Sequence, residues 1–443
     1  MNASISKSIG LALCLVGGAL SLSAQSYTLE ECIALAIRNN PDYQTRALQI
    51  ERSRLQEEAS KNAYLPTVQA GLGQSWDFGR SVDKTGVMSD RSSMGTSGSI
   101  GASYQLFSGF SRLYNMRAAK LQTEAAVANL AQARQDLSVQ VVQHYYALLH
   151  AQRVLEIARE QWRRSGEQRT FAEGMLQSGK WSRDRLAEAQ AVEAESHQGV
   201  VQAENGVEVA KLNLRQLLLV DSIGLQDLDK VEAFARADKM SLRGKALLEE
   251  DLAQRPALLA NSYSIQAAEQ QLRASRAGYM PSLSMSLGYS NNYYRILGNE
   301  YAAFNLPFRE QIRQNGRSYI GLNLSIPIFD AFRTRTQVRQ AQLNLRELQA
   351  TRTSLTAQLR RELESAQLAA QLAKRKIEAS RATYEASRIA EEFAEGNWRV
   401  GRTTMNDLSQ ARNKSIVASL ELLQAEYDYL LKAELLRYYT LEH

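Results

Sequence analysis

Four segments of the chain alternate between apolar and polar residues, which is the pattern of a strand with one apolar face. We predict strands at about 66–78, 97–107, 281–290 and 318–329. In the first, Gln74 is the one lapse on a face that otherwise carries Val68, Ala70, Leu72, Trp76 and Phe78. The opposite faces carry mainly small uncharged residues. This alternation suits any half-buried antiparallel sheet.

The length of these strands and their aromatic residues favour strands that span a membrane. Each strand has about the ten residues that a tilted strand needs to cross a bilayer. Aromatic residues that we expect to form interfacial girdles are Trp76, Phe78, Tyr104, Tyr289 and Tyr319. Four strands cannot close a barrel wide enough for a lumen, so several copies are expected to share one barrel.

The long segments between the strands carry apolar residues every seven positions, which is the pattern of coiled-coil-like helices. One such row consists of Val127, Val141, Leu148, Leu155 and Trp162, interrupted only by Arg134. We predict long helices at about 110–172, 182–219, 332–394 and 404–440. About 60 residues at 1.5 Å rise reach roughly 90 Å, which is more than a globular core needs. The predicted fold is mainly α, with long antiparallel coiled-coil-like helices and a small β part.

The second half of the chain repeats the first. "PTVQAGLG" at 66–73 matches "PSLSMSLG" at 281–288 with an offset of 215 (281 − 66). "LFSGFSR" at 106–112 matches "IFDAFRT" at 328–334 with an offset of 222 (328 − 106). We therefore predict two helix–hairpin–helix repeats, 25–220 and 255–443, joined by a linker or equatorial segment at 221–254. The junctions between helix and strand are Pro66, Pro281, Phe110 and Phe332.

Several features are predicted for the N-terminal part of the chain. Residues 1–24 carry one positive charge, an apolar run and then small residues, which predicts a secretory signal peptide. The mature chain then keeps one cysteine, Cys32, and forms no internal disulfide. A first helix is expected to begin at a capping box made by Thr28 and Glu31 and to stop before Pro41. A second helix is expected at about 43–64.

Composition removes several classes of function. The net charge of +6 is spread over alternating signs without a basic tract, so nucleic acid is not an expected partner. The four histidines (His144, His150, His197 and His443) show no metal-ligand spacing, and no metal or cofactor is predicted. No spacing places a nucleophile beside a base, so no enzyme is predicted.

Several quoted segments together resemble the TolC-type outer-membrane efflux proteins. They are "YTLEECIALAIRNNP", "AYLPTVQAGLG", "YQLFSGFSR", "LSIPIFDAFRT", "GKWSRDRLAEAQ" and "GRTTMNDLSQAR". The resemblance implies a homotrimer whose twelve strands form a barrel in outer-membrane lipid and whose helices form a periplasmic α-barrel. It also implies docking to a periplasmic adaptor and an inner-membrane pump, for efflux or for type I secretion.

The resemblance further assigns roles to the two helix turns. Adaptor docking is implied for Gly179, Lys180, Trp181, Gly401, Arg402 and Thr403. A periplasmic gate is implied for Asp407, Arg185, Asp184, Trp398 and Arg402. Asp407 lies six residues past Gly401, whereas the matching place in the first half is Arg185, so we hypothesise that these two residues pair. Taken alone, an aspartate at a helix turn is equally well explained as a cap.

Two alternatives remain open at this stage. A periplasmic coiled-coil scaffold without channel activity explains the heptads but not four strands with an apolar exterior. A diffusion porin explains the strands, but a single chain of that class needs many more of them. The sequence does not choose between small-molecule and protein cargo.

Overall fold

The computed structural model describes residues 26–82, 88–90, 92–225, 254–298 and 305–439, with isolated positions 233, 234, 237, 252 and 303. The signal peptide predicted at 1–24, most of the segment predicted at 221–254, and His443 lie outside the described residues. The chain forms two compact units, and each takes segments from both sequence repeats. Unit 1 comprises residues 1–40, 140–236 and 374–431, and unit 2 comprises residues 41–139, 237–373 and 432–443.

The regular elements follow the predicted order of helices and strands. In chain order, the principal ones are β1 (Ser26–Tyr27), α1 (Leu29–Asn39), α2 (Pro41–Asn62), β2 (Thr67–Asp77), β3 (Arg80–Val82), β4 (Met88–Asp90), β5 (Ser93–Ser108), α3 (Ser111–Gln177), α4 (Arg183–Leu218), β6 (Gly224–Leu225), α7 (Pro256–Arg276), β7 (Ser282–Ile296), α8 (Phe308–Gln314), β8 (Arg317–Ser325), α9 (Arg333–Arg399) and α10 (Met405–Tyr439). The fold is mainly α with one four-stranded antiparallel sheet, as predicted. None of the described helices has a stretch that is long and apolar enough to cross a membrane.

The repeat is visible in the helix bounds. Both α3 and α9 contain 67 residues, and α9 begins and ends 222 positions after α3 (333 − 111 and 399 − 177). The residues predicted at the junctions directly precede an element in each half. Pro66 precedes β2, Pro281 precedes β7, Phe110 precedes α3 and Phe332 precedes α9. Phe110 and Phe332 both have positive φ, at 67° and 61°. The residue directly before each long helix therefore has a left-handed backbone conformation.

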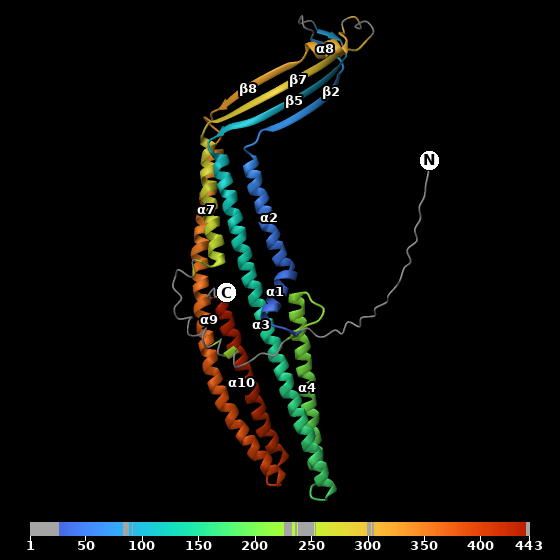
Figure 1. Ribbon diagram of the computed structural model, residues 1–443, viewed down its shortest axis with the longest axis vertical. Coiled ribbons are helices and arrows are strands. Elements are labelled where there is room, and N and C mark those ends of the chain that lie inside the picture. The colour runs from blue at the N-terminus through green and yellow to red at the C-terminus, as the bar shows by residue number, and fades with distance from the viewer. Residues whose placement is uncertain are drawn as a thin grey trace, which may run out of the picture. The chain divides into compact units, whose positions relative to one another are not determined.

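The sheet of unit 2 has the strand order β2-β5-β7-β8 (Figure 1). Its register places apolar residues opposite one another on one face, for example Val68 with Ala102 and Ala102 with Leu287. The other face pairs small polar residues, for example Ser103 with Ser286. Because directly opposed residues of a sheet share a face, this register confirms the predicted separation into an apolar and a polar face.

Three strand bounds differ from the prediction by four residues or more. β5 begins at Ser93 and β7 runs to Ile296, because these two strands continue to pair with each other beyond the apolar stretch. The added residues, "SMGT" at 93–96 and "NNYYRI" at 291–296, lack a regular alternation of apolar and polar residues, so the pattern did not reveal them. β8 ends at Ser325, four residues before the predicted end, because Ser325 pairs with Ser282, the first residue of β7.

One of the expected girdle residues lies on the other face of the sheet. Tyr319 pairs with Gly288, which belongs to the polar face, and its ring occupies the space that a Cβ of Gly288 would need. The prediction that Tyr319 joins an aromatic girdle was therefore wrong, because odd-numbered positions of β8 point to the polar face. Tyr289 is on the apolar face, opposite Ile100.

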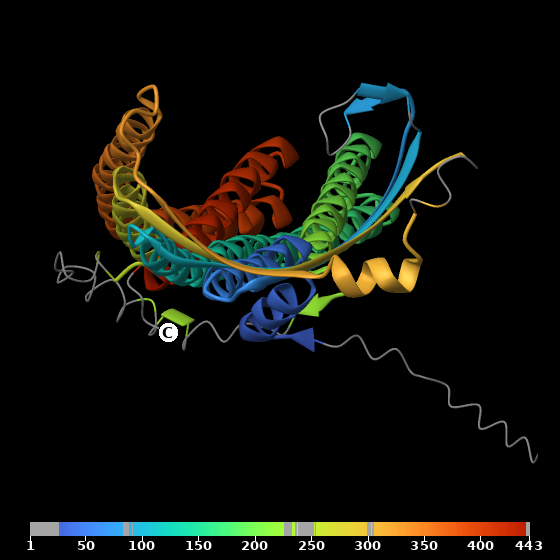
Figure 2. The ribbon, with the colours of Figure 1, turned by 90° about the horizontal axis from the view of Figure 1, so that it is seen from above.

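The outer end of the sheet carries a short helix, α8. Seen from above, the orange helix α8 lies beside the outer part of β7 (Figure 2). Gln311 is the buried residue of this helix, and its side-chain amide accepts from the N–H of Tyr294 at 2.9 Å and donates to the carbonyl of the same residue at 2.8 Å. The segment from 291 to 316, between the third and fourth predicted strands, thus contains the end of β7 and this helix.

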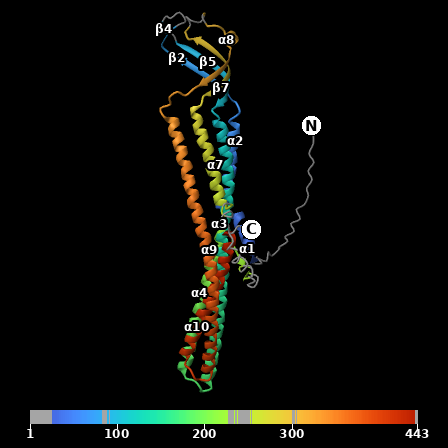
Figure 3. The same cartoon turned by 90° about the vertical axis from the view of Figure 1, so that its left-hand side faces the viewer.

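Unit 1 contains α4, α3 from residue 140, α9 from residue 374 and α10 up to residue 431. In it the two helix pairs, α3 with α4 and α9 with α10, run to their turns at the same end (Figure 3). The predicted capping box of α1 is present, since Glu31 N–H donates to Thr28 Oγ1 at 3.3 Å and Thr28 N–H donates to Glu31 Oε2 at 2.8 Å. The predicted heptad row is buried in its middle, at Val141 and Leu148. Its ends at Val127 and Trp162 are exposed.

Cys32 is fully buried in α1, and burial raises the pKa of its thiol to about 12. At pH 8 only about one thiol in ten thousand is then ionised, and the thiolate is the reactive form. We expect maleimide to label Cys32 about a thousandfold more slowly in the folded protein than in guanidinium chloride, as measured by mass spectrometry of the peptide that contains it. Equal rates in the two conditions would contradict the buried position.

Candidate functional site at the helix turns

Two tight turns reverse the chain between the paired helices, and both use the same hydrogen-bond motif. In the first, Gly179 has a φ of 72°, and the N–H groups of Gly179 and Lys180 donate to carbonyls three and five residues back, each at 2.9 Å. In the second, Gly401 has a φ of 75°, and the N–H groups of Gly401 and Arg402 donate in the same way at 2.9 and 2.8 Å. This is the Schellman motif, whose left-handed position favours glycine.

Three aromatic rings join the two turns inside unit 1. The ring centroids of Trp181 and Trp398 are 4.9 Å apart, and Phe171 lies 5.5 Å from the first and 5.7 Å from the second. Trp398 is only 2% exposed, and it belongs to a buried cluster with Met405 and Leu408. Edge-to-face aromatic pairs add about 0.5–1.5 kcal/mol each beyond the area that they bury. The aromatic cluster of Phe171, Trp181 and Trp398 therefore holds the first helix pair against the second.

The two repeats use equivalent positions of the turns differently. Arg185 and Asp407 are 222 residues apart and occupy the third residue of α4 and of α10. The guanidinium of Arg185 lies over the ring of Trp181, with its carbon 5.1 Å from the centroid. In the described chain the carboxylate of Asp407 accepts hydrogen bonds from Thr403 and Thr404. The pairing of Arg185 with Asp407 stays a prediction.

Asp407 closes a capping box at the start of α10. Its Oδ2 accepts from Thr404 Oγ1 at 2.6 Å and from Thr404 N–H at 3.2 Å, while its own N–H donates to Thr404 Oγ1 at 3.1 Å. These bonds satisfy N–H groups that a helix start leaves without a partner. The hydrogen bonds from Thr404 lower the pKa of the Asp407 carboxyl. The stabilisation from this cap is present above the ordinary carboxyl pKa and is lost as the pH falls through the lowered value.

A buried polar group lies on the same helix, five residues beyond Asp407. Arg412 is 4% exposed, and its guanidinium donates to Gln168 Oε1 on α3 at 2.5 Å. Its Nε lies 3.5 Å from Oε1 of the buried carboxylate Glu391 on α9. Burial lowers the pKa of Arg412. One arginine thus links three helices of unit 1 close to the turns.

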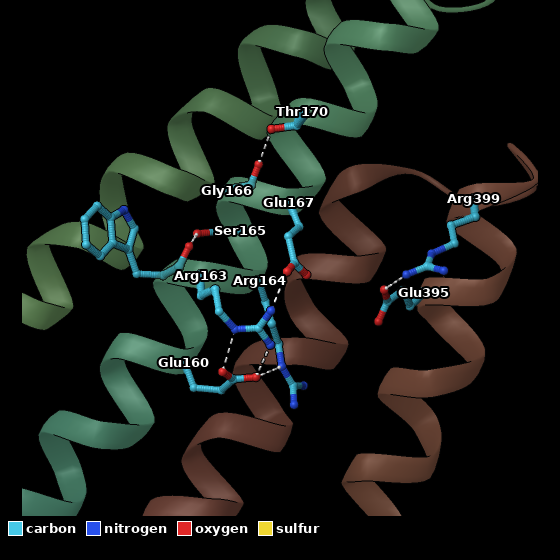
Figure 4. A network of polar contacts seen from close by, with 10 residues as sticks. Glu160, Arg163, Arg164, Ser165, Gly166, Glu167, Thr170, Glu395 and Arg399 are labelled. Atoms are coloured by element: carbon cyan, nitrogen blue, oxygen red, sulfur yellow. Dashed lines mark hydrogen bonds and ion pairs between the residues drawn. The ribbon is translucent and has the colours of Figure 1, made fainter.

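Exposed ion pairs surround this region on α3 and α9. Glu160 accepts from Arg163 at 2.7 Å and from Arg164 at 2.9 Å, and Arg399 donates to Glu395 at 2.6 Å (Figure 4). The hydrogen bond from Arg163, followed by that from Arg164, lowers the pKa of Glu160 to about 2. Such surface pairs contribute little stability, and that contribution is lost as the pH falls from the ordinary glutamate pKa towards 2.

The structure brings some of the sequence-predicted residues together and leaves others apart. Trp181, Trp398 and Arg185 lie in contact within one cluster. Asp184, Lys180 and Arg402 are exposed beside it. Sequence reasoning missed Phe171, Arg412 and Glu391 as residues of this region. For Phe171 the repeated "FAEG" was a signal, but its equivalent Phe393 is 71% exposed and makes no such cluster.

The region carries no recognisable metal chemistry. No group of three histidine, cysteine, aspartate or glutamate side chains with metal-binding geometry occurs among the described residues. Two of the described histidines pack against aromatic rings. The ring centroids of His197 and Trp162 are 4.8 Å apart, and those of His150 and Tyr427 are 5.9 Å apart. Burial lowers the pKa of His150.

Comparison with known proteins gives a consistent result. The family model described as outer membrane efflux protein matches residues 32–218 and 247–440. The chain is 24% identical over 411 residues to the outer membrane efflux protein BepC of Brucella suis biovar 1, covering 92% of this chain and 83% of that protein. It is 26% identical over 429 residues to the outer membrane protein TolC of Vibrio cholerae serotype O1, covering 95% and 92%.

A solved structure of the transmembrane channel protein CusC has the same fold. It superposes with a TM-score of 0.79 at 18% identity, over 94% of this chain and 92% of that one. At this identity the likeness establishes the fold alone.

Proposed function

The chain belongs to the outer membrane efflux protein family, and it is therefore located in the outer membrane. From this premise we propose its function. We infer that three copies form an exit duct that passes substrate from an inner-membrane pump through the periplasm to the exterior. Four strands from each copy form a twelve-stranded barrel in outer-membrane lipid, and the long helices form an α-barrel in the periplasm. The proposal assigns no enzymatic activity.

The observation that carries the proposal is the apolar face of the sheet in unit 2. Large apolar side chains on this face are exposed in the single chain, among them Leu72 at 93% and Ile320 at 77%. Burying such area in lipid is favourable by about 25 cal/mol per Å² of apolar surface. A coiled-coil scaffold, the alternative function, has no use for this face.

The same proposal gives the two turns their roles. A periplasmic adaptor docks at the two turns, at Gly179, Lys180 and Trp181 of the first and at Gly401, Arg402 and Thr403 of the second. The gate is formed by Asp407 with Arg185, Asp184, Trp398 and Arg402. The cargo is either a small molecule or a secreted protein, since both uses need the same duct.

The test of the proposal is single-channel conductance in a planar bilayer, combined with the mass of the purified oligomer. We expect a trimer with small, cation-selective currents. Asp407→Asn removes the charge and keeps an oxygen that accepts from Thr404, so we expect it to lower the selectivity for cations over anions. The expected fall is about fivefold, because two unit charges 4 Å apart in water interact by about 1 kcal/mol.

Asp136→Asn is the matched control, because Asp136 is an exposed aspartate on α3 outside the proposed gate. It should change the selectivity less than Asp407→Asn does. A monomer that carries no current would reject the duct and favour the coiled-coil scaffold.

A further inference from the structure

The apolar face of the sheet changes character at its outer end, where β2 and β7 end. Trp76, Met94 and Arg295 pair across β2, β5 and β7, so these three residues form one row on that face. Thr96 and Tyr293 lie in the next row inward. We call the surface of these two rows the outer margin of the apolar face. It combines aromatic side chains with a positive charge, whereas the middle of the face is mainly aliphatic.

Arg295 is the charged residue on a face whose other paired strand positions are all uncharged. Its side chain is exposed, and in the described part of the chain it has no ion-pair partner. An arginine on a lipid-facing strand is strongly destabilising at the bilayer midplane but costs little near the interface. Tryptophan and tyrosine collect at the same interface. In the proposed barrel, the outer margin therefore lies at the outer surface of the membrane.

The short helix α8 extends this margin beside β7 (Figure 2). The buried side chain of Gln311 binds the backbone of Tyr294, so this side of the helix faces the strand. The ring centroid of Phe308 is 5.2 Å from that of Tyr293, which belongs to the outer margin. Phe308 is nevertheless 60% exposed, and Ile312, one turn later, is 38% exposed. The helix thus continues the apolar surface of the sheet.

α8 also brings a second unpaired arginine to the margin. Arg309 and Arg313 are four residues apart and share one side of the helix. Each is two positions from Gln311, so this side points away from β7. Arg313 pairs with Glu310 at 2.7 Å. Arg309 is exposed and has no ion-pair partner among the described residues, so its charge, like that of Arg295, is not compensated within the described chain.

We propose that Arg295 and Arg309 bind the phosphate groups of lipids in the outer leaflet of the membrane. A guanidinium group is a planar fork of N–H donors that matches the oxygens of a phosphate. Its apolar stem lies along acyl chains while its charge reaches the headgroups. The exposed rings of Trp76 and Phe308 contact the acyl chains beside it. This inference rests on the proposed barrel in outer-membrane lipid and adds a headgroup site to its outer margin.

Arg317 supplies a matched control, because it has the same chemistry on the opposite face. It is exposed and has no ion-pair partner among the described residues. It pairs with Ser290, which belongs to the polar face of the sheet. Its guanidinium group therefore points into the lumen of the proposed barrel, where no lipid headgroup reaches it.

Lipid titration tests the site. The purified full-length protein in a neutral detergent is titrated with lipid A that carries two phosphates, or with the dephosphorylated form of the same lipid, and bound lipid is counted by native mass spectrometry. We expect tighter binding of the phosphorylated form. Arg295→Gln and Arg309→Gln should each weaken that binding about fivefold, and the double variant about 25-fold, because each arginine near anionic headgroups contributes a similar increment. Arg317→Gln should leave the binding unchanged.

Three results would overturn the headgroup site. They are equal binding of the two lipid forms, an equal loss of binding in Arg317→Gln and Arg295→Gln, and full displacement of the lipid by inorganic phosphate, which would indicate a site for free anions. Any of these results from a trimer that conducts in a planar bilayer rejects the headgroup site and leaves the duct standing. A monomer without current rejects both proposals.

Discussion

Trp398→Ala is expected to separate the two helix turns of unit 1. The side chain is almost fully buried between Trp181, Phe171 and Leu408, so its removal takes away contacts made by both helix pairs. Replacing a buried tryptophan by alanine costs about 3–5 kcal/mol. Since each 1.4 kcal/mol changes an equilibrium tenfold, the open state of the turns should become more populated by roughly 100-fold or more.

Limited proteolysis measures this change. Lys180 and Arg402 lie in the exposed turns, so trypsin cleaves there when the turns open. Cleavage follows the population of the open state when opening and closing are fast relative to cleavage. Trp398→Ala should therefore be cut roughly 100-fold faster than the wild-type protein.

Trp162→Ala is the control of the same residue type. Trp162 is 40% exposed and contacts His197 rather than the aromatic cluster, so its removal should change the cleavage rate little. If Trp398→Ala and the wild-type protein were cut at equal rates, the aromatic cluster would not hold the turns together. If the protein forms the proposed duct, channels of the Trp398→Ala variant should also conduct larger currents than wild-type channels.

The fold was predictable because apolar residues recur at two regular spacings along the sequence. Strands with one apolar face repeat every two residues, and packed helices repeat about every seven, so both patterns are visible without any knowledge of contacts. The equivalent bounds of α3 and α9 follow from the internal repeat. The outer extension of β5 and β7 escaped prediction because its stability comes from pairing between strands rather than from an alternating apolar face.

The candidate site was predictable only where a local motif defines it. Glycine at both turns follows from the left-handed position of the Schellman motif. The sequence from Thr404 to Asp407 has the spacing of a capping box. The hydrogen bonds between these two residues could therefore have been predicted from the sequence. The contact between Trp181 and Trp398 joins residues that are 217 positions apart (398 − 181), and no local pattern encodes it.

Buried charges were the least predictable part of the site. Arg412 and Glu391 lie on helices whose sequences are rich in charged residues, and most of those residues face solvent. Nothing in their spacing separates the buried pair from exposed pairs such as Arg388 with Glu392. Only the packing of α3, α9 and α10 around the guanidinium makes this pair different.

Arg412→Ala is expected to destabilise unit 1 strongly. It leaves the buried carboxylate of Glu391 without its nearest cation and Gln168 without its donor. Removing one partner of a buried ion pair costs about 3–5 kcal/mol, because the remaining charge is no longer compensated. Hydrogen exchange of the amides in α10 should therefore become faster by two to three orders of magnitude, since about 1.4 kcal/mol corresponds to a factor of ten.

The double variant Arg412→Met with Glu391→Leu separates the charge from the packing. Replacing a buried ion pair by apolar side chains of similar volume is often neutral or stabilising, because neither charge must then leave water. The double variant should accordingly exchange no faster than the wild-type protein, although each single substitution exchanges faster. Arg388→Ala, which breaks an exposed pair on α9, should have almost no effect. If the double variant were as unstable as Arg412→Ala, shape rather than charge would explain the role of Arg412, and the three helices would depend on its side-chain volume.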